Sequence, residues 1–418
     1  MPTLSVALSN RRRWPVVGML FAGMLISYVD RGILSIAAVP LMKDFGMSPA
    51  AAGALLSAFF WTYSTLQVPA GFLVDRFGIK WTYAIGFAFW SLASAAVGFA
   101  SSLSQILSLR VLLGAGEAVA HPASVTFIRQ NFKEKEQGIP TAIYVSGMTL
   151  GPAVGALLGA TVLTRFGWRP LFLITGLGAL VWLIPWLILA PSRGAAAVPA
   201  EPEQPREPFP WRMLIKLPAF WGLTIGAFFY SYYSFFLLTW LPSYLVMERG
   251  YSFLRMGLFT AIPYVGTVFV SFASARIADR WIARGGRPVY VRKMFVAGGF
   301  LTGSTILLLP HFHSPSAVLG ILMSSLLGTG LASSNYWALT QAISPRALVG
   351  RVTGYQNSIA SLAGLTAPVI TGLVVGKTKS FDLAILFAGG SLLVGLASYL
   401  ILLRESDIQK FQSRFSVG

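Results

Sequence analysis

The chain contains twelve stretches of mostly apolar residues that are each long enough to cross a membrane. A helix needs about 20 such residues to span the hydrocarbon core. In lipid, such a segment can satisfy its backbone hydrogen bonds by forming a helix. The sequence therefore predicts an all-α membrane protein with twelve transmembrane helices. The stretches cover residues 14–39, 50–74, 81–100, 104–129, 138–162, 170–190, 219–246, 254–276, 291–310, 315–341, 351–376 and 382–403.

The composition agrees with a membrane protein. Charged residues make up 11% of the 418 residues and hydrophobic residues 55%, with a mean hydropathy of +0.68. Soluble domains have about 25% charged residues, so this chain has too few charges to cover a soluble surface. The net charge of +18 would suggest nucleic acid in a soluble protein, but here it predicts basic loops and no nucleic-acid partner. The chain has no cysteine and three histidines, so we expect no metal site.

The lysines and arginines predict the orientation of the chain. With the N-terminus in the cytoplasm, 23 of the 32 basic residues fall in cytoplasmic segments, 7 in the opposite loops and 2 inside spans. This bias follows the positive-inside rule. We therefore expect a multi-pass protein of the inner (cytoplasmic) membrane with both termini in the cytoplasm, and contacts between its basic loops and anionic membrane lipids.

The twelve stretches fall into two groups of six. The segment 191–213 between them is rich in Pro, Ala and Glu, a composition typical of a solvated linker. We expect an N-terminal six-helix bundle over 1–190, a cytoplasmic linker over 191–213 and a C-terminal six-helix bundle over 214–418. Asp75-Arg76 after the second stretch has a counterpart in Asp279-Arg280 after the eighth, 204 residues later. Repeats of this kind are common in secondary transporters, whose substrate binds near the midplane.

Two motifs resemble those of the major facilitator superfamily. In that family the Asp-Arg loop is a latch that holds one conformational state, which implies this role for Gly71, Asp75 and Arg76, and for Asp279 and Arg280 in the second half. The alternative is a solvated turn between helices. The motifs are Gly71-x-x-x-Asp75-Arg76-x-Gly78-x-Lys80 and Arg110-x-x-x-Gly114-x-Gly116.

Few ionisable side chains lie inside the predicted spans. Asp30 and Arg31 lie in the first span, and Arg110, Glu117 and His121 in the fourth. Charges at this depth cost about 2.5–3.5 kcal/mol each and are commonly functional. Arg110 and Glu117 are seven residues apart and share a helix face, and Glu117 is expected near the midplane.

These charges suggest a way to couple protons to an anion. Burial favours a neutral carboxyl group, whereas a neighbouring arginine favours the ionised form. An anion that occupies the arginine would therefore promote protonation of the carboxylate. We predict that Asp30 and Glu117 carry protons, Arg31 binds a substrate carboxylate and Arg110 tunes the acids. The alternatives are static ion pairs and, for His121, either packing or proton transfer.

The first and fourth spans are also similar to motifs of the anion:cation symporter family, which includes bacterial galactonate and hexuronate symporters. The resemblance implies proton sites at Asp30 and Glu117 and substrate contacts at Tyr28, Tyr63, Ser334, Trp337 and Asn357; interhelical hydrogen bonds and packing are the alternative for the polar and aromatic set. Some eukaryotic members have a further arginine where this chain has the aromatic run 228–233, so a dicarboxylate is less expected. The motifs are Tyr28-Val-Asp30-Arg31-x-x-Leu34-Ser35-x-Ala37 and Arg110-Val-Leu-Leu-Gly114-Ala-Gly116-Glu117-Ala-Val-Ala-His121-Pro122-Ala123.

The sequence thus predicts a monomeric, proton-coupled symporter that imports an organic monoanion, most consistent with a sugar acid, by alternating access, without a cofactor. A second hypothesis is a proton-driven exporter of drugs or metabolites, because the glycines of the fifth span resemble a motif of drug antiporters. A third is a membrane enzyme or sensor, which the lack of a nucleophile–base pair, nucleotide loop or metal cluster disfavours. The glycine motif is Gly147-x-x-x-Gly151-Pro152-x-x-Gly155-x-x-x-Gly159.

Overall fold

The computed structural model describes residues 10–133, 136–191, 211–344, 349–404 and 406–408. These residues form helices and connecting turns, with no β-strand among them. The chain divides into two compact units, Met1–Arg206 with Ser252–Gly257 and Glu207–Tyr251 with Leu258–Gly418. Most of the linker predicted over 191–213 lies outside the described residues.

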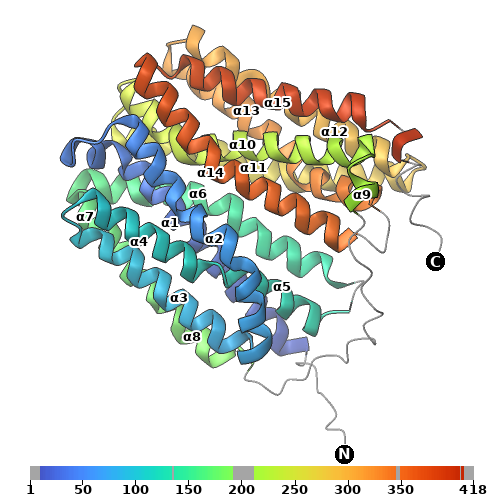
Figure 1. Ribbon diagram of the computed structural model, residues 1–418, viewed down its shortest axis with the longest axis horizontal. Helices are drawn as coiled ribbons and strands as arrows, with labels where there is room; N and C mark the ends of the chain where they lie inside the picture. The colour runs from blue at the N-terminus through green and yellow to red at the C-terminus, as the bar shows by residue number, and fades with distance from the viewer. Residues whose placement is uncertain (1–9, 134–135, 192–210, 345–348, 405, 409–418) are drawn as a thin grey trace, which may run out of the picture. The chain divides into compact units, whose positions relative to one another are not determined.

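The first unit consists of α1 to α8, coloured blue to green in Figure 1. α1 packs along α6, and α4 lies between α2 and α3. A short 3-10 turn extends α3, and another joins α7 to α8 so that these two form one continuous helical stretch. The helices are α1 (Asn10–Asp44), α2 (Pro49–Phe77), α3 (Ile79–Ala96), α4 (Leu103–Glu117), α5 (Ala120–Asn131), α6 (Gly138–Phe166), α7 (Trp168–Ala179) and α8 (Leu183–Leu189).

The second unit consists of α9 to α15, and the first residues of its long helix α11 belong to the first unit. α12 packs along α13, and α10 packs against both α14 and α15. A 3-10 turn over Ser304–His311 continues α12. The helices are α9 (Trp211–Leu214), α10 (Pro218–Met247), α11 (Phe253–Ala283), α12 (Pro288–Gly303), α13 (Pro315–Ile343), α14 (Val349–Thr378) and α15 (Asp382–Leu402).

All twelve predicted spans coincide with long helical stretches, which confirms the all-α membrane fold. By length and composition alone, however, ten of the described helical stretches qualify as membrane spans. The other two are α2 and α10, which are long enough at 29 and 30 residues. In α10 the run of tyrosines, serines and tryptophan between the apolar residues lowers the mean hydropathy. Membrane crossing by these two helices therefore stays a prediction.

The glycines of the fifth predicted span bring α6 against α1. A Cβ added at Gly151 would lie 2.8 Å from the carbonyl oxygen of Leu25 and would overlap Tyr28. A Cβ at Gly147 would lie 2.8 Å from the carbonyl oxygen of Phe21. Small residues at four-residue spacing allow close helix packing in membranes. In this chain the glycines thus hold the face of α1 that carries Tyr28.

The helical stretch of the fourth predicted span is interrupted directly after Glu117. α4 ends at Glu117 and α5 begins at Ala120. Pro122 explains the interruption, because proline has no N–H and its ring clashes with the carbonyl four residues earlier, that of Ala118. Gly114 and Gly116 let α4 approach its neighbours: an added Cβ would overlap the backbone of Phe59 at Gly114 and would lie 2.8 Å from the ring of Phe89 at Gly116.

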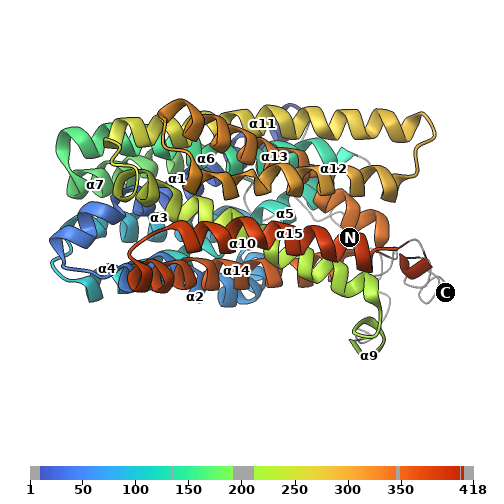
Figure 2. The same cartoon turned by 90° about the horizontal axis from the view of Figure 1, so that it is seen from above.

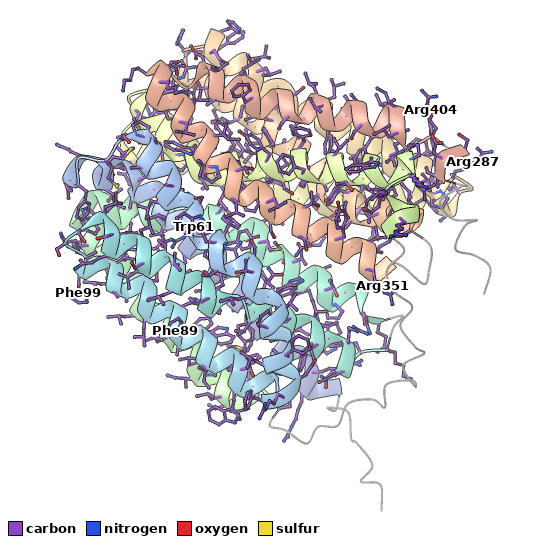
Figure 3. The ribbon with its side chains drawn as sticks, in the orientation of Figure 1. Trp61, Phe89, Phe99, Arg287, Arg351 and Arg404 are labelled. Atoms are coloured by element: carbon purple, nitrogen blue, oxygen red, sulfur yellow. The ribbon has the colours of Figure 1, made fainter. Side chains whose placement is uncertain are left out.

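The outer surface of the first unit is apolar, as expected for a surface that faces lipid. Phe89 and Phe99 have exposed side chains on its outer side (Figure 3). In the second unit, Arg287, Arg351 and Arg404 lie toward one end (Figure 3). All three belong to segments for which the sequence predicts a cytoplasmic location.

Candidate functional site

Arg31 and Glu117 form a buried ion pair between α1 and α4. Arg31 donates from Nε to Oε1 of Glu117 at 3.0 Å, and its Nη2 donates to the same oxygen. Ser27, one turn before Arg31, donates its hydroxyl to that oxygen at 2.5 Å. The other carboxylate oxygen, Oε2, is buried and has no hydrogen-bond partner among the described residues. Glu117 is 1% exposed and Arg31 7%, so water screens the pair little.

Aromatic rings from α1 and α2 surround the guanidinium group of Arg31. Its Cζ lies 4.5 Å from the ring centre of Tyr28, 4.4 Å from that of Phe59 and 4.7 Å from that of Tyr63. Each ring face attracts a cation by about 0.5–2 kcal/mol, more when water is excluded. The rings therefore fix the position of Arg31 without supplying a second anion. Of the predicted site residues, the fold thus brings together Tyr28, Arg31, Tyr63 and Glu117.

Asp30 and Arg110 lie beside this pair but are not joined to each other by an ion pair in the described part of the chain. Asp30 accepts a hydrogen bond from Ser94 of α3 at 3.3 Å, and its Oδ2 has no partner there. Arg110 lies 5.8 Å from the ring centre of Phe59, and its Nε and Nη1 are buried without a partner. Arg110 still interacts electrostatically with both acids. Among these four side chains, the described part of the chain thus contains one ion pair, that of Arg31 with Glu117.

Glu117 lies midway along the helical stretch Leu103–Asn131. His121, one turn further on, shares a hydrogen bond of 3.1 Å between its Nδ1 and the hydroxyl of Tyr144 in α6. His121 therefore has a polar partner within the first unit and does more than pack at the proline.

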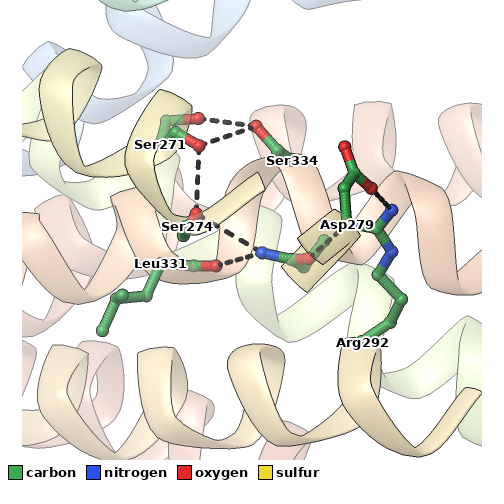
Figure 4. A network of polar contacts seen from close by, with 7 residues as sticks. Ser271, Ser274, Asp279, Arg292, Leu331 and Ser334 are labelled. Atoms are coloured by element: carbon green, nitrogen blue, oxygen red, sulfur yellow. Dashed lines mark hydrogen bonds and ion pairs between the residues drawn. The ribbon is translucent and has the colours of Figure 1, made fainter. Parts of the chain in front are cut away.

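In the second unit, Ser334 of α13 belongs to a polar network with α11 and α12 (Figure 4). Its hydroxyl lies 2.7 Å from that of Ser271. The next residue, Asn335, donates to Ser274 at 3.3 Å and accepts from Nη1 of Arg292 at 2.8 Å. The network thus extends from a predicted substrate residue to a cation on α12.

The latch predicted at Asp279 and Arg280 has a different partner in the structure. Asp279 forms an ion pair with Arg292 of α12 rather than with its neighbour Arg280 (Figure 4). Neighbouring residues on a helix point in directions about 100° apart, so adjacency in sequence does not favour a contact. Arg280 instead lines a pocket with Trp281 and Arg284.

The latch residues of the first half lie at the end of α2. Asp75 and Arg76 are exposed, and Arg76 lies 5.4 Å from the ring centre of Phe77. Neither has an ion-pair partner within the described ranges. Gly78 separates α2 from α3 with a φ of 83°, a conformation that favours glycine. An added Cβ at Gly71 would meet nothing within 4 Å, so local packing does not explain that glycine.

The remaining predicted substrate residues, Trp337 and Asn357, lie on α13 and α14 of the second unit. Trp337 packs edge-on against Tyr336, with ring centres 5.1 Å apart. Asn357 is half-buried, and its backbone carbonyl accepts a hydrogen bond from Ser361. Among the described residues, no group of three or more His, Cys, Asp or Glu side chains could hold a metal ion.

Sequence reasoning missed three residues that shape the site. Ser27 binds Glu117, Ser94 binds Asp30, and Phe59 lies against both Arg31 and Arg110. Ser27 carried a usable signal, because it lies four residues before Arg31 on the same face. Ser94 and Phe59 carried none, since they come from α3 and α2.

A helical membrane fold with buried acids beside arginines is characteristic of a transporter. Comparison with known families establishes the class. Residues 20–368 match the family model of the Major Facilitator Superfamily. The chain belongs to this superfamily and is a transporter, not an enzyme.

Two bacterial transporters resemble the chain over nearly their whole length. A D-galactonate transporter of Escherichia coli O6:H1 is 28% identical, over 96% of this chain and 98% of that protein. A Bacillus subtilis protein named "Probable galactarate/D-glucarate transporter GudP" is 28% identical, over 93% and 91%. The predicted similarity to bacterial sugar-acid transporters is thus confirmed.

The fold is also that of a solved transporter. The crystal structure of a bacterial homolog of the human lysosomal transporter Spinster matches 95% of this chain and 96% of its own, with a TM-score of 0.73 and 18% identity. This likeness concerns the fold alone.

Proposed function

We propose that this protein imports an organic monoanion, a sugar acid of the hexonate or hexuronate type, together with protons. The observation that carries the proposal is the buried Arg31–Glu117 pair in its aromatic surroundings. Arg31 is a cation that already holds a carboxylate at this depth, so it can hold that of a substrate. The sugar-acid relatives support the substrate class.

The pair couples proton and anion by competition. Arg31 contacts only one oxygen of Glu117, whereas its planar fork can bind both oxygens of a free carboxylate. A substrate that takes Arg31 leaves Glu117 buried and unpaired, and a buried unpaired carboxylate is strongly destabilised. Proton uptake on Glu117 removes this cost. The substrate and the proton therefore favour each other's binding, as linkage requires.

Asp30 supplies the second proton site in this proposal. Arg110 tunes how readily Asp30 and Glu117 take up a proton. The two arginines and two carboxylates sum to zero charge when all are ionised. One bound monoanion makes the site negative by one charge, and one proton restores neutrality. A second proton on Asp30 makes transport of a monoanion electrogenic.

The second unit contributes uncharged groups in this proposal. Ser334, Trp337 and Asn357 offer a hydroxyl, an indole N–H and an amide, which suit the hydroxyl groups of a sugar acid. The run 228–233 on α10 has no cation for a second carboxylate. We therefore expect a monoanion such as D-galactonate to be preferred to a dianion such as galactarate.

Alternating access of the N-terminal bundle (1–190) and the C-terminal bundle (214–418) of a monomer completes the proposal. Asp75 and Arg76, with Gly71 before them, and Asp279 and Arg280 act as latches between states. The exporter hypothesis remains the alternative, since the α6 glycines show only close packing on α1.

Uptake into proteoliposomes tests the function. The purified chain is given an inward proton gradient and radiolabelled D-galactonate, L-galactonate, galactarate or D-glucarate, with and without an uncoupler, and a sodium gradient as a separate arm. Uncoupler-sensitive accumulation of a galactonate supports the proposal. Accumulation that needs sodium alone, or transport of cations only, contradicts it.

The orientation can be tested on the chain as it stands, because it has no cysteine. We propose that it resides in the inner membrane with both termini in the cytoplasm. Ser416→Cys and His313→Cys place one thiol each on sides predicted to be opposite. A membrane-impermeant maleimide should label His313→Cys in intact spheroplasts and Ser416→Cys only after lysis. The reverse labelling would overturn the orientation.

A further inference from the structure

The end of α11 carries a pocket that includes one of the predicted latch residues, Arg280. Ile277, Arg280, Trp281 and Arg284 line it, just before the helix turns toward α12 (Figure 2). These residues are three or four positions apart, so they share one face of the helix. Their side chains are exposed, including the ring of Trp281 at 44%. The pocket is thus open to a ligand from outside the unit.

The charge of this segment is strongly positive. Residues 276–293 contain six basic residues and one acid, Asp279. Asp279 forms an ion pair with Arg292 of α12. In the described part of the chain, neither Arg280 nor Arg284 has a side-chain hydrogen bond or an ion pair. Two guanidinium groups therefore face the pocket without an anion.

An exposed apolar stripe continues from the pocket along α11. Ile277 is 53% exposed, and Phe269, about two turns earlier, is also exposed. Phe253–Ala283 is apolar and long enough to cross a membrane, so the pocket lies at the end of a membrane span. Tryptophan is typical of this level, where lipid headgroups meet the acyl chains.

We propose that this pocket binds the headgroup of an anionic phospholipid. The forks of Arg280 and Arg284 match the phosphate oxygens, Trp281 lies at headgroup level, and the acyl chains run along Ile277 and Phe269. The stripe favours a lipid over a soluble phosphate, because a soluble ligand has no use for it. This inference does not depend on the transported substrate.

Native mass spectrometry of the purified, delipidated full-length chain tests the proposal. The chain is titrated with phosphatidylglycerol, with phosphatidylcholine of the same acyl chains, and with glycerol phosphate as a soluble headgroup. We expect tight binding of phosphatidylglycerol alone, weakened about tenfold or more in the double variant Arg280→Gln/Arg284→Gln, since each basic contact contributes about 1 kcal/mol. The double variant Arg165→Gln/Arg404→Gln removes the same charge from exposed arginines elsewhere and should bind as the wild type does.

Three results would overturn the site. They are unchanged phosphatidylglycerol binding in Arg280→Gln/Arg284→Gln, an equal loss in the control variant, and binding of glycerol phosphate as tight as that of the lipid. Fluorescence gives a second measurement that leaves the arginines in place. Brominated phosphatidylglycerol should quench the wild type more than Trp281→Phe, and brominated phosphatidylcholine should not distinguish them. Equal quenching by phosphatidylglycerol would also contradict the proposal.

Discussion

Arg31 of α1 holds one oxygen of Glu117 of α4 across 86 positions of sequence, and the other oxygen of that carboxylate is buried without a partner in the described part of the chain. Removal of one member of a buried ion pair costs about 3–5 kcal/mol of stability, because the remaining charge is buried without a partner. A substrate carboxylate that replaces Glu117 keeps Arg31 paired, and a proton on Glu117 then removes the cost of its stranded charge. The pair is therefore suited to exchange between an internal carboxylate and a substrate carboxylate.

Glu117→Gln should abolish proton-driven accumulation while leaving exchange of labelled for unlabelled substrate. Glutamine keeps the shape of the side chain but cannot take up a proton, so binding persists without coupling. Uptake and counterflow in proteoliposomes separate the two effects. Glu136→Gln is the control, because Glu136 forms a half-exposed ion pair with Arg13 away from the site. Unchanged proton-driven accumulation in Glu117→Gln would show that Glu117 is not the carrier.

Arg31→Ala should weaken substrate binding by about tenfold or more, since hydrogen bonds to charged groups contribute about 1.5–3 kcal/mol each. It should also destabilise the fold, because Glu117 loses its cation. The double variant Arg31→Ala/Glu117→Gln should recover thermal stability without recovering affinity. Titration calorimetry and thermal unfolding measure the two quantities. Wild-type affinity in Arg31→Ala would exclude the carboxylate-binding role.

Gly151→Ala should lower the melting temperature and the transport rate together. The added Cβ overlaps Tyr28 and crowds the backbone of Leu25, and overpacking of this kind costs about 1–3 kcal/mol. Gly18→Ala is the matched control, since a Cβ there meets nothing within 4 Å. If both variants melt as the wild type does, close packing of α6 on α1 does not position Tyr28.

Asn335→Ala should lower the stability of the protein, whereas Asn357→Ala should lower its affinity for the substrate. Asn335 is fully buried and links Arg292 to Ser274, so its loss removes one acceptor from Arg292 and one donor from Ser274 and costs about 1–3 kcal/mol of stability. Asn357 is half-buried, and its replacement should lower substrate affinity with little change in melting temperature. Melting curves and binding isotherms of both variants check this. Lower affinity in Asn335→Ala and lower stability in Asn357→Ala would contradict these roles.

The sequence predicted the helices well because span length is a strong signal. It also placed Tyr28, Arg31, Tyr63 and Glu117 in one site by resemblance. The pairing of Arg31 with Glu117 was not predictable from spacing, because it depends on how α1 packs against α4. The latch partner Arg292 was missed for the same reason, since Asp279 reaches it across helices.

The most direct test of the central claim counts the protons taken up when substrate binds. Titration calorimetry with the transported sugar acid, repeated in buffers of different ionisation enthalpy, gives this number for the wild type and for Glu117→Gln. If the substrate displaces Glu117 from Arg31, the wild type should take up protons on binding and Glu117→Gln should take up about one fewer. Equal proton uptake by the two proteins would contradict the exchange of carboxylates at Arg31.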